Sequence, residues 1–255
     1  HSINIEKFTR KRIKWKFLVM FKSWFFRAIL FFLLGIFLFI YGIAVDRYRV
    51  FPFKQISYIK NIILPTSTPY KEKKPRATLF DYFFPQVDVV MIGDSIIQNA
   101  IWSEIFPNIK IANRGLVGDT TEGILKRMDT ILSVQPKKAL IMIGIMDIYS
   151  GLSVNEIINN YVEIIEELRA KGITVVVQST LECSKIECEG RLDKVRQLNQ
   201  KLEEYSANHN FVFVDINKRL SSSEEGLLSR YSYDGIHLIG KGYSVWAEQI
   251  SGAVN

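Results

Sequence analysis

The chain has 255 residues, 48% of them hydrophobic, and its 33 Lys and Arg against 26 Asp and Glu give a formal net charge of +7. This length fits one α/β domain with an appended segment and does not require a second globular domain. The charge is uneven, because residues 1–76 hold 16 basic and 3 acidic side chains whereas residues 77–255 hold 17 and 23. The larger part is acidic, which excludes a basic nucleic-acid-binding surface on it, and no nucleic-acid partner is expected.

The first element in chain order is an uncharged apolar run of 18 residues, Ala28–Val45. As a helix it measures roughly 27 Å, close to the hydrocarbon thickness of a bilayer. Residues 1–27 are strongly basic, so the positive-inside rule predicts a cytoplasmic N-terminus and a periplasmic or extracellular location for the rest of the chain. A cleaved signal peptide is the competing interpretation, but no A-x-A site follows the run. We expect a single transmembrane helix that anchors the protein.

Residues 46–76 read as a juxtamembrane segment that ends in a Pro-rich, basic linker, and residues 77–255 as the catalytic domain. In this domain, short β-rich runs alternate with helical patterns. The five runs predicted as strands are 87–93, 109–113, 138–144, 173–180 and 211–216. Four are almost continuously apolar, which is typical of strands covered on both faces. The alternation predicts a five-stranded parallel sheet with helices on both faces and an active site at the carboxyl ends of the strands.

Two helical patterns are the most distinct. The first covers residues 153–172, where Ser153 is a candidate N-cap, Glu156 follows three residues later and Gly172 marks the end. The second covers residues 191–207, and His209 falls at its expected end, where we expect a capping or solvated role. Trp102 and Trp246 are expected to pack in the core.

The two cysteines, Cys183 and Cys188, lie five residues apart. Outside the cytoplasm they are suited to a short disulfide, which we favour over two free thiols. A zinc site is not expected, because the chain has three histidines and no second C-x-x-C.

A candidate nucleophile follows the first predicted strand, in Gly93-Asp94-Ser95. A serine is a weak nucleophile unless a base, usually a histidine oriented by a carboxylate, takes its proton. Asp234 and His237 are three residues apart near the C-terminus, so one loop can supply both the base and its orienting acid.

Four sequence blocks fall in the order GDS at 93–95, NRGLVGDTT at 113–121, IMIGIMDI at 141–148 and DGIHLIGKGYSVWA at 234–247. Together they resemble the conserved blocks of the SGNH (GDSL-type) hydrolase family, in particular its bacterial acylhydrolase and platelet-activating-factor-acetylhydrolase-like members. The resemblance implies a flavodoxin-like three-layer α/β/α sandwich that hydrolyses or transfers ester-linked acyl groups without a metal or organic cofactor.

The resemblance also implies roles for single residues. Ser95 matches the nucleophile, His237 the base and Asp234 the residue that orients it. Gly115 matches the glycine whose backbone N–H helps to form the oxyanion hole, and the Ser95 N–H is expected as a second donor. The absence of a G-x-S-x-G motif argues against an α/β-hydrolase fold.

One block departs from the family pattern G-x-N-D, because Met146 stands where the family has an asparagine that donates to the oxyanion. A thioether cannot donate a hydrogen bond, and loss of one such donor costs roughly 100- to 1000-fold in turnover. Three interpretations stay open: a slow enzyme, a substitute donor such as Asn113 or Asn99, or a fold kept for binding. Asp147 is expected to anchor a loop.

Three functions follow. The first is a membrane-anchored serine esterase acting on an acylated glycan or lipid. The second is an O-acyltransferase that passes the acyl group from Ser95 to a sugar hydroxyl, beside an integral-membrane acyl-transfer partner. The third is a catalytically silent binding or assembly subunit, which the methionine at position 146 suggests.

Overall fold

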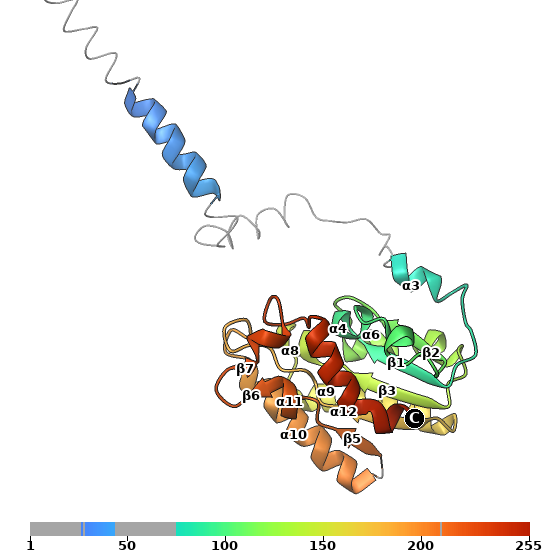
Figure 1. The fold of residues 1–255 in the computed structure, drawn as a ribbon. Coiled ribbons are helices and arrows are strands. Elements are labelled where there is room, and N and C mark those ends of the chain that lie inside the picture. The colour runs from blue at the N-terminus through green and yellow to red at the C-terminus, as the bar shows by residue number, and fades with distance from the viewer. Residues whose placement is uncertain (1–26, 28, 44–74, 210) are drawn as a thin grey trace, which may run out of the picture. The chain divides into compact units, whose positions relative to one another are not determined.

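The computed structural model describes residues 27, 29–43, 75–209 and 211–255, and the chain divides into two compact units, His1–Lys71 and Glu72–Asn255 (Figure 1). In the first unit, residues 29–43 are helical and exposed. No helix in the described ranges combines the length and the apolar character needed to cross a membrane, so the predicted transmembrane helix is not found there. Residues 28, 44 and 45 of the predicted span, the basic residues up to 26 and the segment 46–74 lie outside the described residues.

The second unit is built from strands and helices in alternation. Its five long strands are β1 (Val89–Gly93), β2 (Ile111–Gly115), β3 (Lys138–Met142), β4 (Thr174–Gln178) and β5 (Val212–Val214), and a small hairpin is formed by β6 (Ser221–Ser222) and β7 (Gly226–Leu227). Its helices are α3 (Pro75–Leu79), α4 (Ser95–Gln98), α5 (Trp102–Ile105), α6 (Thr121–Leu125), α7 (Met128–Leu132), α8 (Ile145–Tyr149), α9 (Val154–Ala170), α10 (Leu192–His209), α11 (Asn217–Leu220), the 3₁₀ turn η1 (Ser229–Tyr231) and α12 (Gly240–Val254).

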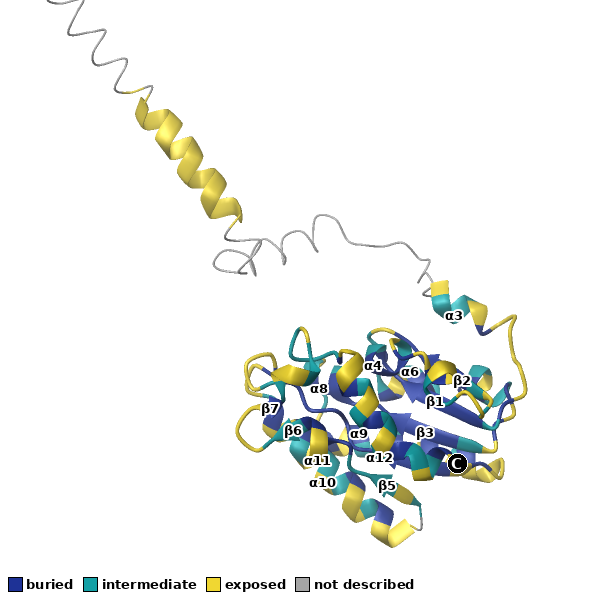
Figure 2. Cartoon of the chain, viewed as in Figure 1, coloured by how far each residue is buried: buried dark blue, intermediate teal, exposed yellow. Residues whose placement is uncertain are grey.

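The five long strands form one parallel sheet in the order β2-β1-β3-β4-β5. This is the flavodoxin-like order, so the predicted fold class is confirmed for this part of the chain. All five residues of β1 and four of the five in β3 are buried, and both strands appear dark blue in Figure 2. Because neighbouring residues of a strand point to opposite faces, burial at successive positions means that both faces of the sheet are covered.

The helices that cover the sheet fall into two groups. On one face, α5 contacts α12 through Trp102 and Trp246, whose rings lie edge to face with centroids 5.2 Å apart. The second group is centred on α9, which contacts α6 and α10. Both tryptophans are buried, which confirms their predicted packing role. Right-handed crossovers place helices on opposite faces when the strand order reverses, as it does after β2.

The predicted boundary signals of α9 are confirmed. The Ser153 side chain accepts from the Glu156 N–H, and the Glu156 carboxylate accepts from the Ser153 N–H, which completes a capping box. The second helical pattern, predicted over 191–207, is α10 and extends to His209, whose Nδ1 lies 2.9 Å from the Tyr205 carbonyl. The disulfide between Cys183 and Cys188 is present, with Cα atoms 5.4 Å apart.

Candidate active site

Ser95 is the first residue of α4, directly after β1 at the carboxyl edge of the sheet. The turn into this helix requires a glycine, because a Cβ on Gly93 would collide with the Met142 carbonyl oxygen and the Ile97 side chain. Asp94 caps the helix, and its Oδ1 accepts from the Ile96 N–H at 2.9 Å. The strand end, the close approach of β3 and the cap together fix where the serine stands.

The three side chains predicted as a triad form one hydrogen-bonded chain. Ser95 Oγ lies 2.9 Å from His237 Nε2, and His237 Nδ1 lies 2.7 Å from Asp234 Oδ2. The first contact joins residues 142 positions apart, whereas the second lies within one short loop. When the Nδ1 proton lies on the side of Asp234, Nε2 is free to take the serine proton.

Asp234 is held as a carboxylate by its own loop. Its Oδ1 accepts from the backbone N–H groups of His237 at 2.7 Å and Ile236 at 2.9 Å. Partial burial would raise the pKa of Asp234, but the hydrogen bonds from His237 and Ile236 outweigh it and hold the pKa below its usual value. Ser232 closes the loop by donating to the His237 carbonyl at 2.6 Å. The imidazole therefore rests on a charged, firmly positioned partner.

A second carboxyl, that of Asp94, lies next to the serine, and its pKa is shifted in the direction opposite to that of Asp234. The side chain of Asp94 is fully buried, and its Oδ2 has no hydrogen-bond partner in the described part of the chain. Burial raises the pKa of Asp94 to about 7, although the Ile96 N–H and the nearby His237 act to lower it. No pattern in the sequence indicates that Asp94 is buried, because only the folded chain places it as the N-cap of α4 at the carboxyl edge of the sheet.

The prediction that the Gly115 N–H serves the oxyanion hole is corrected by the structure. This N–H donates to Asn113 Oδ1 at 3.0 Å and is already occupied within the protein. Gly115 is needed for another reason, since a Cβ there would meet the backbone of Gln98 and the Asp94 carbonyl oxygen at 2.9 Å. The glycine lets β2 approach the helix that begins with the serine.

Two other backbone N–H groups, those of Ser95 and Gly118, donate to no atom of the described residues. Gly118 has a φ of +66° in the turn between β2 and α6. The two residues before Gly118 tie this turn to the ends of β1 and α4: the Leu116 N–H donates to the Gly93 carbonyl at 3.0 Å, and the Val117 N–H to Gln98 Oε1 at 3.0 Å. Sequence reasoning missed Gly118, although a second glycine before a capped helix is a signal for a left-handed turn.

Of the two expected substitutes for the missing asparagine, Asn113 uses its amide elsewhere in the protein. The Asn113 side-chain amide donates to the carbonyls of Ile97, Gln98 and Ala100 at 3.0–3.2 Å. Asn99 is exposed and lines a separate cavity that does not include Ser95. Met146 lies in α8, half-buried against the core. The Asn113 amide is therefore occupied within the protein, and the Met146 thioether cannot donate.

The predicted anchoring role of Asp147 is confirmed. This buried carboxylate accepts from the Thr121 N–H at 3.0 Å and from the Thr121 hydroxyl at 2.5 Å. Burial raises the pKa of Asp147, and the hydrogen bonds from Thr121 oppose the shift. α8 is thereby tied to the start of α6, whose N-cap is Thr120.

The linker prediction also needs one correction. Arg76, placed in the linker by the sequence, lies in α3, and its guanidinium donates to the carbonyls of Gly115 and Asn113 at 3.1 Å. A segment outside the predicted catalytic domain therefore holds the strand end beside the serine.

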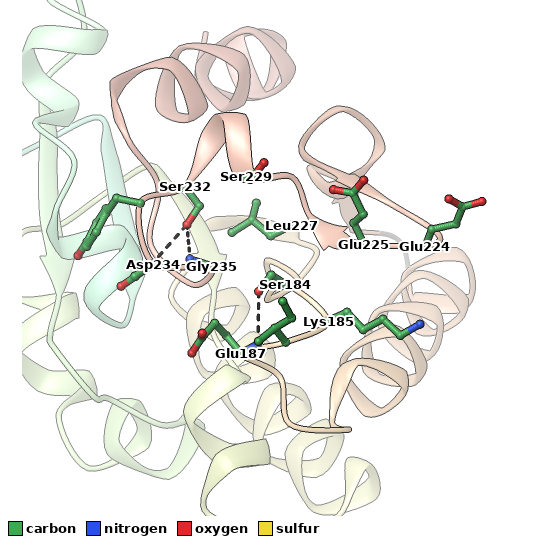
Figure 3. Close-up of a pocket in the computed structure, with 12 residues that line it drawn as sticks. Ser184, Lys185, Glu187, Glu224, Glu225, Leu227, Ser229, Ser232, Asp234 and Gly235 are labelled. Carbon is green, nitrogen blue, oxygen red and sulfur yellow. Dashed lines mark hydrogen bonds between the residues drawn. The ribbon is translucent and has the colours of Figure 1, made fainter. Parts of the chain in front are cut away.

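A cavity of about 610 Å³ adjoins the Asp234 loop (Figure 3). Three segments form its walls: the disulfide loop, the β6–β7 hairpin and the stretch from η1 to Gly235. Tyr233, whose ring stacks on His237 with centroids 6.0 Å apart, is among its lining residues. No group of three or more His, Cys, Asp or Glu side chains suited to a metal ion occurs in the ranges that the structure describes.

Known proteins resemble this chain in sequence and in fold. The GDSL-like Lipase/Acylhydrolase family matches residues 91–245. Platelet-activating factor acetylhydrolase IB subunit alpha2 of Rattus norvegicus is 27% identical over 177 residues, which cover 62% of this chain and 71% of that protein. A GDSL-like lipase from Bacteroides thetaiotaomicron has a similar fold, with a TM-score of 0.63 at 23% identity over 70% of this chain and 94% of its own. An acetyl xylan esterase aligns with a TM-score of 0.57 at 18% identity, over 66% and 99%.

Proposed function

The chain belongs to the GDSL-like lipase/acylhydrolase family and is an ester-hydrolysing serine hydrolase, and we propose that it cleaves acyl esters through Ser95, His237 and Asp234. The observation that carries this proposal is the continuous chain of hydrogen bonds, 2.9 Å and 2.7 Å long, that joins the three side chains. This arrangement of hydroxyl, imidazole and carboxylate is the one that activates a serine for acyl transfer.

The proposed reaction has two halves. His237 Nε2 takes the proton from Ser95 Oγ as this oxygen attacks the ester carbonyl, and then returns the proton to the departing alcohol oxygen. The acyl group is left on Ser95 as an ester. A water molecule, deprotonated by the same imidazole, attacks this ester; the bond between the acyl carbon and Ser95 Oγ breaks, the acid leaves, and His237 Nε2 returns the proton to Ser95 Oγ. Asp234 stays ionised and stabilises the imidazolium in both halves, which its lowered pKa supports.

The negative charge on the reacting carbonyl oxygen needs hydrogen-bond donors. We assign this role to the N–H groups of Ser95 and Gly118, which have no partner among the described residues. Methionine at position 146 contributes no third donor. The proposed enzyme therefore works with a smaller oxyanion hole than the family pattern provides.

The proposed acyl group is acetyl or of similar length, carried by a glycan or a lipid. The relative named as a platelet-activating factor acetylhydrolase supports the short acyl group. A panel of nitrophenyl esters of increasing chain length, followed by acetylated glycans and acetylated lipids, tests this assignment. A rate that rises steadily with acyl length contradicts it.

We also propose that the catalytic unit works outside the cytoplasm, tethered through the apolar run 28–45. The support is the sequence pattern and the disulfide, since disulfides persist in oxidising compartments. Protease treatment of cells stripped to their plasma membrane tests the location: digestion of the C-terminal unit is expected, and complete protection until that membrane is lysed contradicts the proposal.

Covalent labelling tests the nucleophile. A fluorophosphonate probe is expected to label the wild-type protein and not the Ser95→Ala variant, while Ser103→Ala keeps full labelling as a control on a neighbouring helix. Incubation with an acetyl ester and candidate glycans then separates hydrolysis from transfer, because transfer places acetyl on sugar rather than releasing acetate. A wild-type protein that resists the probe at high concentration contradicts the catalytic role and supports a binding subunit.

A further inference from the structure

The loop closed by Cys183 and Cys188 touches the proposed acid–base segment directly. The Ser184 N–H donates to the Gly235 carbonyl at 2.7 Å, and Gly235 lies between Asp234 and His237. Gly235 has a φ of +77°, and a Cβ on it would lie 2.5 Å from Ser184 Oγ and 2.7 Å from Glu187 Cγ. The loop and this segment are therefore in contact through a backbone hydrogen bond and through the Ser184 and Glu187 side chains that lie against Gly235. Figure 3 labels these three residues at the cavity.

The same loop is held from two other directions. On the side of the β6–β7 hairpin, the Lys185 N–H donates to the Glu225 carbonyl at 2.8 Å, and the Leu227 N–H donates to the Cys183 carbonyl at 3.2 Å. On the side of α8, the Tyr149 hydroxyl donates to the Glu187 carbonyl at 2.6 Å. The loop thus links the hairpin, α8 and the Asp234–His237 segment.

The disulfide restrains a loop whose tip is not held by apolar packing. The side chain at the loop tip, Ile186, is 84% exposed, so burial of apolar surface contributes little at that position. Both cysteines are buried, and within the loop the Cys188 N–H donates to the Ser184 carbonyl at 2.9 Å. A cross-link across so few residues restricts the unfolded chain less than one that closes a long loop. Its main effect is accordingly local: it keeps the Ser184 N–H directed at Gly235.

We propose that the disulfide loop, residues 183–188, is a positioning element for the base, acting through the Gly235 carbonyl on Asp234 and His237. Cys183, Cys188 and Tyr149 are then positioning residues that touch no reacting atom. The inference rests on the proposed triad. Loss of the cross-link frees the loop and lets the imidazole drift from Ser95, and a displacement of about 1 Å is enough to cost on the order of 100-fold in rate.

The test distinguishes a displaced His237 from a loss of folded protein, because kcat is expressed per active site that the fluorophosphonate labels. The Cys183→Ala/Cys188→Ala double variant removes the cross-link, and Tyr149→Phe removes one hydroxyl from the α8 contact while keeping the ring. Tyr82→Phe, at a tyrosine that is 76% exposed, is the matched control. For each protein, kcat and KM are measured on nitrophenyl acetate, and kcat is divided by the number of sites labelled to completion with the fluorophosphonate.

Positioning predicts that kcat per labelled site falls about 10-fold or more in the double variant and about threefold in Tyr149→Phe, with KM within about twofold of wild type. The control keeps the wild-type value. A merely structural role lowers the number of labelled sites and leaves kcat per site unchanged, which overturns the inference. If the double variant does not fold, kcat per labelled site of Tyr149→Phe alone tests the inference. A wild-type protein that neither labels nor hydrolyses overturns the proposed triad and this inference with it, so the two failures are distinguishable.

Discussion

The two sides of Ser95 differ in how their hydrogen bonds are used. On the side of His237, every contact that activates a serine is formed: two short hydrogen bonds run from Ser95 Oγ to Asp234, and the second carboxylate oxygen is held by two backbone N–H groups. On the oxyanion side, the Gly115 N–H and the Asn113 amide are bound within the protein, and Met146 cannot donate. The backbone N–H groups of Ser95 and Gly118, which donate to no atom of the described residues, are left for the oxyanion.

This difference reflects how each side is built. The acid and the base come from one loop, where three residues of separation already bring them together. The oxyanion side depends on β2, α4 and α8, which meet only when the sheet is assembled. The comparison teaches that activation of the nucleophile and stabilisation of its product can be varied separately on this fold, and three predictions test how far they are independent.

The largest effect is expected on the acid–base side. Asp234→Asn keeps the size of the side chain but removes the charge and turns the imidazole toward the wrong tautomer, which in a serine triad costs about 10⁴-fold in kcat. The measurement is steady-state hydrolysis of nitrophenyl acetate, normalised by the number of folded sites. Asp129→Asn, on the surface of α7, serves as the control. A loss below about tenfold would show that this side is not the dominant contributor.

An intermediate effect, of opposite sign, is expected on the oxyanion side. Met146→Asn introduces an amide at the position where the family pattern has its donor, and a recovered oxyanion contact raises kcat by about 10- to 100-fold, within the range of such donors. Met146→Leu is the control, because it changes the packing at the same position without adding a hydrogen-bond donor. Equal rates in Met146→Asn and wild type would mean that the two backbone N–H groups already suffice.

The smallest effect on activity, and a clear one on stability, is expected at Asp94, between the two sides. Its pKa is raised to about 7 in the folded protein from a reference of 3.8. The native state therefore binds a proton that the unfolded state has released, so folding stability falls as the pH rises from about 4 to 7, by on the order of 4 kcal/mol. Asp94→Asn keeps the capping oxygen and removes this titration.

Urea unfolding at pH 5 and pH 8 checks the prediction at Asp94. The wild-type protein is expected to lose more stability between the two pH values than Asp94→Asn, whose curve is flatter because no buried carboxyl ionises. The titrating groups that do not interact with Asp94 are shared by the two proteins and cancel in the difference. Parallel pH dependences would falsify the assignment of a raised pKa to this carboxyl.

Much of the architecture was predictable because it depends on local pattern. Short β-rich runs, four of them almost continuously apolar, identified all five strands, and the Ser153 and Glu156 capping signal marked the start of α9. Boundaries were less exact: β2 extends to Gly115, two residues beyond the predicted run, because it pairs with β1 as far as Gly93. The predicted transmembrane helix was not found among the described residues.

By itself, the sequence determined the strand and helix pattern, the family blocks and the pairing of Asp234 with His237, since each depends on residues close together in the chain. The tertiary structure alone decided what the backbone and amide donors do. In the folded chain the Gly115 N–H donates to Asn113, and those of Ser95 and Gly118 have no partner among the described residues. The fold also brings Arg76 against the end of β2 and the disulfide loop against the Asp234–His237 segment. An N–H group donates to whichever acceptor the folded chain brings within about 3 Å, and the spacing of residues along the sequence does not specify that acceptor.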